Sequence, residues 1–517
     1  MDRIKYYRRR QFVLGPRAVN PGGWEEHDLE GLGFLVVHPD LAVTTVRIPA
    51  GLLVLLGDVL DSRSPASGNR GILEEAAARV TNADQLPAVL EPLSGRFVLL
   101  AALNGTRRLY HDAVGLRQVT YCRDGDGAVW CASQAETLAE VLRYGHDPEV
   151  LSYRNLPMYQ RDRGEFWLLH DRTPYRAVRH LLPNHCLDLD TGRASRYWPV
   201  PGAIPQLSIA DSIEQCTPIL EGSIAAAASR FDLCLGMSAG MDSRKTLAAA
   251  REVRDRIRYF SHAPGHDRLD VHDIRVPARL LPRLGLRHES LGWNPMSSDF
   301  REIYEASATW AREKKGHIAH TLFRHFGPDT VIMNSNISEV AQCVYWLPAR
   351  HLDGEGLAIL SGLNHPFAVR SFQAWVDGAA PACEAAGMEL LDLFFLEQRM
   401  GRWTVAAFSE YDVAHDTFNP YNNRLLHRMM LAIHPRHRRD RRWDVPIRQI
   451  RAMWPDVLCE PVNPQDSLHE QLQQTLRRFV VHRTITPWLP VYQYLRFLKK
   501  RRRYIAQGAE NAAGASQ

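Results

Sequence analysis

The stretch Phe231–Ala249 (FDLCLGMSAGMDSRKTLAA) constrains the fold of this chain more than any other part of it. A short apolar run ends in the small and polar residues Ser238–Ser243, and an alanine-rich segment follows. This order predicts a buried strand, a tight loop and a helix. Backbone N–H groups of such a loop turn toward one point, and the positive dipole end of the helix faces the same point. The stretch therefore predicts either an anion site or a plain turn between strand and helix.

One carboxylate in the loop narrows the choice of anion. Asp242 would repel a bare phosphate, so its position favours a phosphate ligand that arrives with a divalent cation. We therefore expect ATP as the nucleotide and Mg²⁺ held by Asp242. The expected nucleotide-binding residues are Met237, Ser238, Ala239, Gly240, Met241, Asp242 and Ser243.

The loop resembles the pyrophosphate-binding loop of N-type ATP pyrophosphatases, which usually reads SGGxDS. This chain differs from that pattern at Ala239 only. The resemblance implies that ATP is split between its alpha and beta phosphates to adenylate a substrate.

Length and composition predict a large enzyme of two domains. The chain has 517 residues, of which 45% are hydrophobic and 23% are charged, and a single core stops growing well short of this length. No apolar run approaches the roughly 18 residues that a membrane-spanning helix needs. No signal-peptide core follows the basic N-terminus, so we expect a cytoplasmic protein. A net charge of +5 over this length does not indicate a nucleic-acid partner.

The two halves of the chain differ in pattern. Residues 1–205 contain short runs rich in Val, Leu and Thr, with turn signals at Ser94-Gly95, Asn104-Gly105 and Asp124-Gly125. The expected strands are Gly33–His38, Leu41–Ile48, Leu52–Gly57, Arg96–Ala102, Arg107–His111 and Ala128–Ala132. Residues 206–504 alternate strand and helix patterns, as a parallel sheet requires. We expect a bridge between the halves at residues 181–205 and a disordered tail at residues 505–517.

A series of motifs resembles the asparagine synthetase family, in the order that this family has. They are Ser94-Gly-Arg-Phe97, His111–Tyr121, Ala132-Ser133, Pro183-Asn-His185, Arg196-Tyr-Trp198 and, in the second half, Asn419-Pro-Tyr421. The resemblance covers most of the chain. It implies an α+β N-terminal nucleophile-like αββα sandwich, followed by an α/β parallel-sheet ATP-pyrophosphatase (synthetase) domain.

The second residue departs from the glutamine-hydrolysing members of that family. They carry a cysteine there as the amino-terminal nucleophile, and this chain has Asp2. The chain therefore resembles members without glutaminase chemistry, such as beta-lactam synthetases and lasso-peptide macrocyclases. Those enzymes activate a carboxylate with ATP and let an amine of the substrate attack it.

A second loop, at residues 331–340, departs from the family pattern S-G-E-G-x-D-E. Glu339 matches the final Glu, whereas Ser338 stands in place of the metal-binding Asp and Ser335 in place of a Glu. Asp242 and Glu339 remain as the expected metal ligands, and Glu339 is also an expected catalytic residue. A carboxylate that merely begins a helix is the alternative interpretation of Glu339.

The family places a lysine late in the synthetase domain, and this chain has none between Lys315 and Lys499. The equivalent region, Trp454–Pro464, offers no cation. Arginine can hold phosphate but cannot carry a proton, so a replacement would act through its charge. The candidates are Arg399, Arg448 and Arg451, with Arg399 and Arg451 the preferred pair.

Two further groups of polar residues accompany the second strand of this half. His262 follows the strand at Arg258–Phe260, where the family binds adenine, through either its backbone or its side chain. Asp270, His272 and Asp273 have the composition of a metal site, but a helix cap at Asp273 explains them better.

We therefore expect an AMP-forming carbon–nitrogen ligase that uses ATP and Mg²⁺ and acts on a carboxylate and an amine, with a peptide as one possible substrate. The expected setting is specialised-metabolite or peptide biosynthesis, including macrolactam formation. Two alternatives stay open. They are a catalytically inactive scaffold that binds nucleotide or a peptide partner, and an amidation enzyme of surface-polysaccharide biosynthesis.

Overall fold

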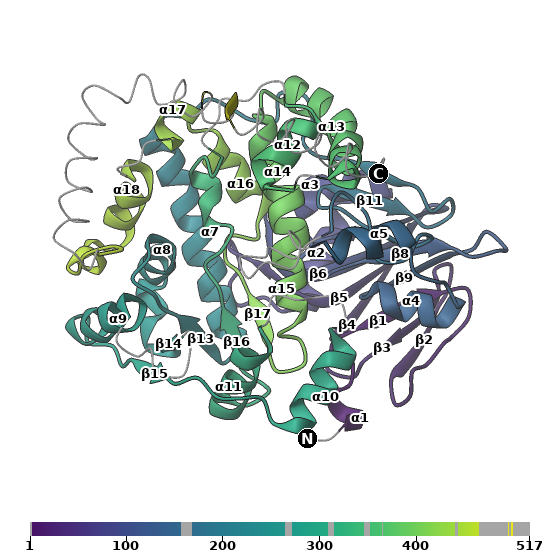
Figure 1. Cartoon of the computed structure of the whole chain (residues 1–517), viewed down its shortest axis with the longest axis horizontal. Helices are drawn as coiled ribbons and strands as arrows, with labels where there is room; N and C mark the ends of the chain where they lie inside the picture. The colour runs from purple at the N-terminus through teal and green to yellow at the C-terminus, as the bar shows by residue number, and fades with distance from the viewer. Residues whose placement is uncertain are drawn as a thin grey trace, which may run out of the picture.

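The computed structural model describes residues 3–156, 168–263, 271–308, 315–345, 352–363, 365–439, 443–464, 495, 498 and 499. Asp2, Asp270 and the tail expected at residues 505–517 lie outside these ranges. Figure 1 shows the strands of the first half, purple to blue, beside the helices and the smaller sheet of the second half, teal to yellow.

The first half contains two six-stranded antiparallel sheets. One has the order β10-β8-β9-β1-β3-β2, and the other has the order β12-β11-β7-β6-β5-β4. The strands are β1 (Phe12–Gly15), β2 (Glu25–Leu29), β3 (Gly33–Val37), β4 (Val43–Ile48), β5 (Gly51–Asp61), β6 (Leu93–Leu103), β7 (Thr106–His111), β8 (Thr120–Arg123), β9 (Val129–Ala132), β10 (Arg179–His180), β11 (His185–Asp188) and β12 (Ala194–Arg196). All six expected strands are confirmed, and β5 and β6 extend beyond the expected bounds.

The two sheets pack face to face through every second residue of their strands, and the residues between these are apolar too and lie under helices. Phe12 and Leu35 from one sheet meet Val54, Val98 and Leu109 from the other in one buried cluster. Helices cover the outer faces, with α4 on the first sheet and α2 and α3 on the second. The helical segments of this half are α1 (Arg3–Tyr6), α2 (Asn69–Ala78), η1 (Ala83–Gln85), α3 (Leu86–Leu90), α4 (Ala135–Leu142) and α5 (Pro148–Arg154).

Two expectations for the first half are wrong. Ser94-Gly95 is not a turn, because both residues lie inside β6 and pair with β5. Gly95 has φ +121°, and a Cβ there would lie 2.2 Å from the carbonyl oxygen of Asp58, so glycine serves close strand approach. The segment at residues 181–205 is not a plain bridge, since β11 and β12 within it complete the edge of the second sheet.

The second half contains a five-stranded sheet in which every pair is parallel, with the order β15-β14-β13-β16-β17. Its strands are β13 (Leu233–Gly236), β14 (Ile257–His262), β15 (Glu289–Leu291), β16 (Val331–Met333) and β17 (Asp416–Phe418). The central strand β13 is buried on both faces, as parallel sheets require. Leu233 and Leu235 pack in the large core shared with the helices, and Cys234 packs on the opposite face. The parallel sheet expected for this half is confirmed.

Helices surround this sheet on both faces. Their long members include α7 (Ile209–Arg230), whose first turn is capped by the Ser208 hydroxyl accepting from Asp211 N over 3.1 Å. The other helical segments are α8 (Met241–Ala249), η2 (Arg251–Arg256), α9 (His272–Arg283), α10 (Ser298–Ser307), α11 (Gly316–Phe326), η3 (Ser338–Ala341), α12 (Gly354–Ser361), α13 (Pro366–Ala386), α14 (Leu390–Phe394), η4 (Phe395–Thr404), α15 (Val405–Ser409), α16 (Arg424–Leu431), α17 (Pro435–Arg438), α18 (Asp444–Met453) and η5 (Pro455–Leu458).

Buried ion pairs join the two halves beside β17. Arg96 donates to Asp412 over 2.8 Å and to Asp416 over 2.9 Å, and Arg117 donates to Asp416 over 2.9 Å. Burial opposes ionisation of Asp416, but Arg117, Arg96 and Arg10 together hold its pKa well below the usual range. The first half therefore fixes the edge of the parallel sheet.

A second buried contact joins motifs that lie far apart in the sequence. Glu397 is fully buried and accepts two hydrogen bonds from the Arg196 guanidinium. Asn184 Nδ2 and Trp375 Nε1 also donate to it, over 3.0 Å and 2.9 Å. The Pro183–His185 and Arg196–Trp198 motifs of the first half are thus anchored on one carboxylate of the second half.

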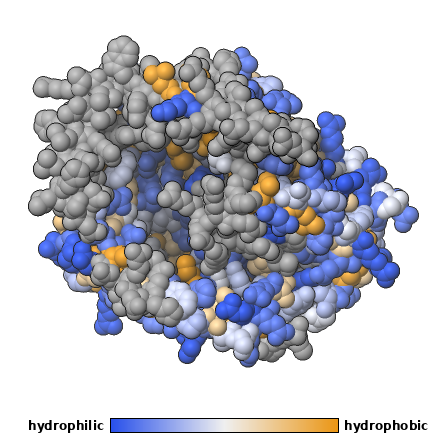
Figure 2. All heavy atoms as spheres, in the orientation of Figure 1, coloured by the Kyte–Doolittle hydropathy of each residue, from blue (hydrophilic) through white to orange (hydrophobic). Residues whose placement is uncertain are grey.

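No described helix has the length and apolar character needed to span a membrane. Figure 2 shows that the described surface on this face is mainly hydrophilic, with hydrophobic residues in small groups.

Candidate nucleotide site at the carboxyl edge of the parallel sheet

The Ser238–Ser243 loop lies at the carboxyl end of β13, the central strand, and leads into α8. Ligands of open parallel sheets bind at this edge. Hydroxyls hold the loop in shape, because Gly240 N donates to Ser238 Oγ over 3.1 Å and Ser238 N donates to Ser243 Oγ over 3.2 Å. The predicted order of strand, loop and helix is confirmed.

A carboxylate of the protein already accepts a hydrogen bond from one of the backbone N–H groups of the loop. Ala239 N donates to Asp273 Oδ1 over 3.0 Å. Asp273 was expected to cap its own helix, and that expectation is wrong, because α9 follows Val271 and has no side-chain cap. The loop amide therefore binds an oxyanion within the protein itself, which is the property that a phosphate site requires.

Asp242 lies in the first turn of α8 and meets the 331–340 loop. Ser338 Oγ donates to Asp242 Oδ1. Lys245 Nζ lies 3.1 Å from the same oxygen and donates to the carbonyl oxygen of Ser338 over 3.0 Å. Lys245 is 1% exposed, and its Nζ lies 5.7 Å from the centre of the Tyr421 ring. The loop serine in place of the family's Asp thus binds the carboxylate of the first loop.

Glu339 is the second carboxylate of the site. Burial, and then the charge of Asp242, raise its pKa, while Lys245 and Arg399 act in the opposite direction. Its Oε2 atom is buried without a hydrogen-bond partner among the described residues. Glu339 also stands in the first turn of η3, as the helix-start interpretation expects, and its role as a metal ligand stays a prediction.

The backbone of the 331–340 loop is strained where it turns toward Asp242. Ile337 is fully buried and has φ +75°, a region that β-branched residues rarely adopt. Such a conformation costs on the order of 1–3 kcal/mol and persists only where the surroundings enforce it. A side-chain contact joins the same loop to α8, because Thr246 Oγ1 donates to Ser335 Oγ over 2.9 Å. The left-handed conformation of Ile337 turns the chain so that the next residue, Ser338, contacts Asp242.

Residues 454–464, which contain no lysine or arginine, lie directly against the first loop. Asn463 N donates to the carbonyl oxygen of Ala239 over 3.0 Å. Arg244 of α8 is fully buried and donates to the carbonyl oxygens of Glu460 and of Pro461, the latter over 2.6 Å. Its guanidinium therefore fixes this region to α8.

The three arginines expected to take the place of a late lysine are placed differently. Arg399 lies in η4 close enough to Glu339 to lower its pKa, and its guanidinium lies 5.0 Å from the centre of the Trp403 ring. Arg451 is exposed on α18, and Arg448 of the same helix pairs with Asp444 over 2.9 Å. Only Arg399 of the three is brought to the carboxylate pair.

His262 ends β14, next to the central strand. Its Nε2 atom is buried without a hydrogen-bond partner among the described residues, and burial, followed by the charge of His317, lowers its pKa. The imidazole is thus a neutral donor or acceptor near the sheet edge. In the described part of the chain, no cluster of three or more His, Cys, Asp or Glu side chains has the geometry of a metal site.

Lys245 is the site residue that sequence reasoning missed. Lys245 precedes the lysine-free region between Lys315 and Lys499, and it follows Asp242 by three residues in a segment expected to be helical. Residues at that spacing are neighbours on a helix. The spacing was therefore a usable signal.

The residues present fit a magnesium nucleotide. Mg²⁺ prefers carboxylate oxygens, and Asp242 and Glu339 supply two carboxylates at one edge of the sheet. Glu339 Oε2 is buried without a hydrogen-bond partner among the described residues, whereas Asp242 Oδ1 contacts Ser338 Oγ and Lys245 Nζ. A cation at this site would bind the open oxygen of Glu339 and would share Asp242 with Ser338 and Lys245.

Comparisons with known proteins give only distant likenesses. No protein-family model matches the chain, and no curated protein matches its sequence. One similar solved structure is a glutamine phosphoribosylpyrophosphate amidotransferase from B. subtilis in complex with ADP and GMP, with 13% identity over 55% of this chain and 66% of that chain and a TM-score of 0.23. A glutamine-dependent NAD⁺ synthetase from Acinetobacter baumannii in complex with ADP has 17% identity over 33% of this chain and 32% of that chain, with a TM-score of 0.19.

A third structure, described as the allosteric regulatory enzyme of purine biosynthesis, has 14% identity over 59% of this chain and 75% of that chain, with a TM-score of 0.24. The matches to the first two structures span less than two thirds of those chains. With likenesses this distant, the function of this chain rests on its own residues.

Proposed function

We propose that this chain is an ATP-dependent ligase that adenylates a carboxylate, releases pyrophosphate and lets an amine capture the acyl-adenylate to form an amide bond. The observation that carries the proposal is a pair of carboxylates, Asp242 and Glu339, that lie close enough to interact electrostatically beside the Ser238–Ser243 loop. The loop follows the carboxyl end of the central parallel strand β13, and α8 begins within it, so the N-terminal end of the helix lies at the loop.

In this proposal the loop amides and the hydroxyls of Ser238 and Ser243 bind the phosphates of ATP, since both hydroxyls already face each other across 3.2 Å. Asp242 and Glu339 hold Mg²⁺, and His262 lies toward the adenine. The metal supplies charge neutralisation for the leaving pyrophosphate. Met237 and Met241 are buried in the large core, so they anchor the two ends of the loop.

Lys245 has a positioning role. Its ammonium group holds Asp242 Oδ1 and the carbonyl of Ser338 at once, so it joins the two loops and offsets part of the charge of the carboxylate pair. Lys245 is 1% exposed and is engaged by Asp242 and Ser338, so it is not open to a ligand. Arg399 is therefore the cation that we propose to act beside Glu339.

We assign residues 1–205 to a glutaminase-like domain and residues 206–504 to the synthetase domain. The proposed setting is specialised-metabolite or peptide biosynthesis, including lasso-type macrolactam formation. The motif resemblance to beta-lactam synthetases and macrocyclases supports this setting.

The test is isotope exchange between pyrophosphate and ATP in the presence of Mg²⁺ and pools of carboxylic acids, followed by AMP measurement after amines are added. We expect exchange that needs one acid, and AMP formation that needs one amine as well. Asp242→Asn should abolish exchange, while the surface variant Arg47→Gln should exchange normally. Formation of ADP and phosphate in place of AMP would overturn the proposal.

A second candidate is a nucleotide-binding scaffold without catalysis. Ser335 and Ser338 favour it, because they replace acidic residues of the family and bind Thr246 and Asp242 instead. Tight Mg²⁺-ATP binding without exchange on any acid would favour this candidate.

A further inference from the structure

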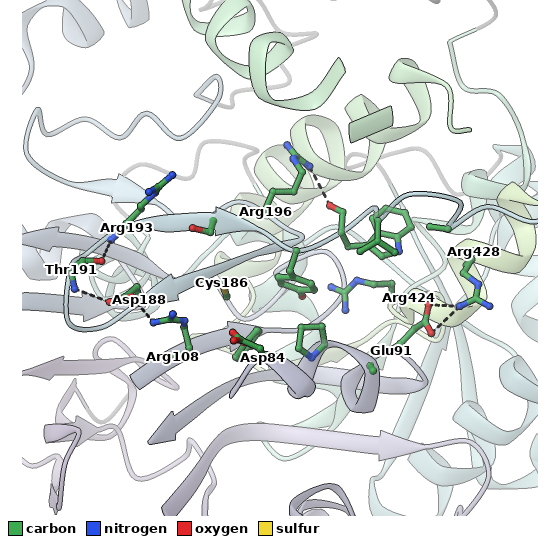
Figure 3. Close-up of a pocket in the computed structure, with 18 residues that line it drawn as sticks. Asp84, Glu91, Arg108, Cys186, Asp188, Thr191, Arg193, Arg196, Arg424 and Arg428 are labelled. Atoms are coloured by element: carbon green, nitrogen blue, oxygen red, sulfur yellow. Dashed lines mark hydrogen bonds and ion pairs between the residues drawn. The ribbon is translucent and has the colours of Figure 1, made fainter. Parts of the chain in front are cut away.

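A large cavity lies away from the candidate nucleotide site. It is formed between the sheet β12-β11-β7-β6-β5-β4 of the first half and α16 of the second half. Its volume is about 760 Å³, within the range of small-molecule sites. Residues of β7, β11 and β12 form one wall, and η1, α3 and α16 form the others. Figure 3 shows the residues that line it.

Five arginines line this cavity, and three of them are neutralised by carboxylates. Arg108 pairs with Asp188, Arg196 with Glu397, and Arg428 with both oxygens of Glu91 over 3.0 and 3.1 Å. In Figure 3, Arg428 faces Glu91 and Arg108 faces Asp188. These guanidinium groups do not need a further anion.

Arg424 differs from those three. It is 3% exposed, and it takes part in none of the ion pairs formed by the described residues. Its Nε donates to Asn184 Oδ1 over 3.3 Å, and its guanidinium lies 5.0 Å from the centre of the Tyr197 ring. Its Nη2 atom is buried without a partner among the described residues. A buried charge without a counterion is costly, so this site favours an anion from outside the chain.

The other lining groups indicate the rest of the ligand. Pro87, Ala203 and Trp198 line the cavity together with Val200. Val200 is 50% exposed, and among the large hydrophobic side chains of the described residues only Leu495 is exposed as well. An inorganic ion would leave this apolar surface uncovered. In Figure 3 the Arg424 guanidinium lies among the lining side chains, whereas Arg196 turns its guanidinium away from them.

We propose that this cavity binds a small organic oxyanion, whose carboxylate or phosphate group pairs with Arg424 and whose apolar part covers Val200. Guanidinium binds both kinds of oxyanion through paired N–H donors. The bound ligand would contact both halves of the chain, because Arg424 begins α16 and Val200 belongs to the first half. The inference does not depend on the proposed function.

The test uses calorimetry at constant ionic strength, without ATP or Mg²⁺. The probes are benzoate, its uncharged counterpart benzamide, phenyl phosphate and inorganic phosphate. We expect one of the two aromatic anions to bind, and benzamide to bind at least about tenfold more weakly because it lacks the charge. Benzoate and phenyl phosphate distinguish a carboxylate site from a phosphate site. Equal binding of phenyl phosphate and inorganic phosphate would overturn the organic part of the proposal.

Arg424→Gln keeps a hydrogen-bond donor near Asn184 and removes the charge, so it should weaken binding of the preferred anion at least about tenfold. Arg47→Gln is the matched control on the surface, since Arg47 is 65% exposed and pairs with Glu30. Ser243→Ala separates this cavity from the nucleotide loop, and it should leave anion binding unchanged.

Removing an unpaired buried charge should not lower the melting temperature of the ligand-free protein. If Arg424→Gln fails to fold, Arg424→Lys decides, because it keeps the charge and loses the paired donors and should weaken binding in the same order of probes. Unchanged affinity in the foldable Arg424 variant, or no binding of either aromatic anion to the unaltered protein, would overturn the proposal.

Discussion

Lys245 Nζ lies 3.1 Å from Asp242 Oδ1, one helical turn away on α8, and the same ammonium group donates to the carbonyl of Ser338. One buried cation thus connects the Asp242 carboxylate of the first loop, the proposed metal ligand, with the backbone of the second loop. The protonation of Glu339 depends on both residues, because the charge of Asp242 raises its pKa and the charge of Lys245 lowers it.

Asp242→Asn should weaken magnesium-dependent ATP binding strongly and change folding little. The side chain is 39% exposed, so its loss removes little from the core, whereas a metal ligand facing a triphosphate contributes much to binding. Calorimetry with and without Mg²⁺ measures the first effect, and thermal unfolding measures the second. Equal ATP affinity in both proteins would exclude the loop as the metal site.

Lys245→Gln should raise the pKa of Glu339 further, because Lys245 lowers it in the unaltered protein. The pH midpoint of Mg²⁺ binding should therefore move upward, and Lys245→Arg should restore most of the shift. Adenylation should fall as well, because the two loops lose the ammonium group that holds Asp242 and Ser338 together. Lys5→Gln is the matched control, since its side chain is exposed. An unchanged pH midpoint would contradict the positioning role.

Magnesium affinity should increase as the pH rises through the raised pKa of Glu339, because the cation binds the ionised carboxylate. The free energy of unfolding depends on pH in the opposite direction. In the interval above the ordinary value of 4.5, the folded protein binds more protons than the unfolded chain, so the free energy of unfolding falls as the pH rises. Glu339→Gln should flatten both dependences. Calorimetric titrations and denaturant unfolding at several pH values measure them.

Glu397→Gln should lower the free energy of unfolding by about 3–5 kcal/mol, because it leaves the Arg196 guanidinium without its counterion in a buried site. Burial opposes ionisation of Glu397, but Arg196 and His185 lower its pKa. Its stabilising contribution is therefore present above the ordinary value of 4.5 and is lost as the pH falls through the lowered pKa. Urea unfolding at neutral pH tests the magnitude. Glu30→Gln, on an exposed pair, should hardly change stability.

The strands, the parallel sheet and the 238–243 loop could be predicted because they depend on local pattern. Short runs rich in Val, Leu and Thr identified β3 to β7, and Asn104-Gly105 marked the turn between β6 and β7, where both residues have positive φ. Gly95 was misread as a turn because its positive φ serves close strand approach, and sequence alone does not separate the two uses.

The contacts across the site could not be predicted in the same way. The Asp273 carboxylate reaches the amide of Ala239, 34 residues away, and Ser338 reaches Asp242 across 96 residues. Local preference favoured a helix cap for Asp273, and tertiary contact overrode it. No signal in the sequence marked Arg424, because the packing of α16 against the first half is what buries its charge outside the ion pairs of the described residues.

The ion pairs beside β17 have a consequence for attempts to divide this chain into fragments. A break near residue 206 would strip Asp412 and Asp416 of the guanidinium groups of Arg96 and Arg117, and each half would present unpaired charges at a surface shaped for burial. We expect neither fragment to accumulate as a folded product when it is expressed alone. Co-expression of the two fragments should rescue both, since complementary charges at close range also speed their encounter.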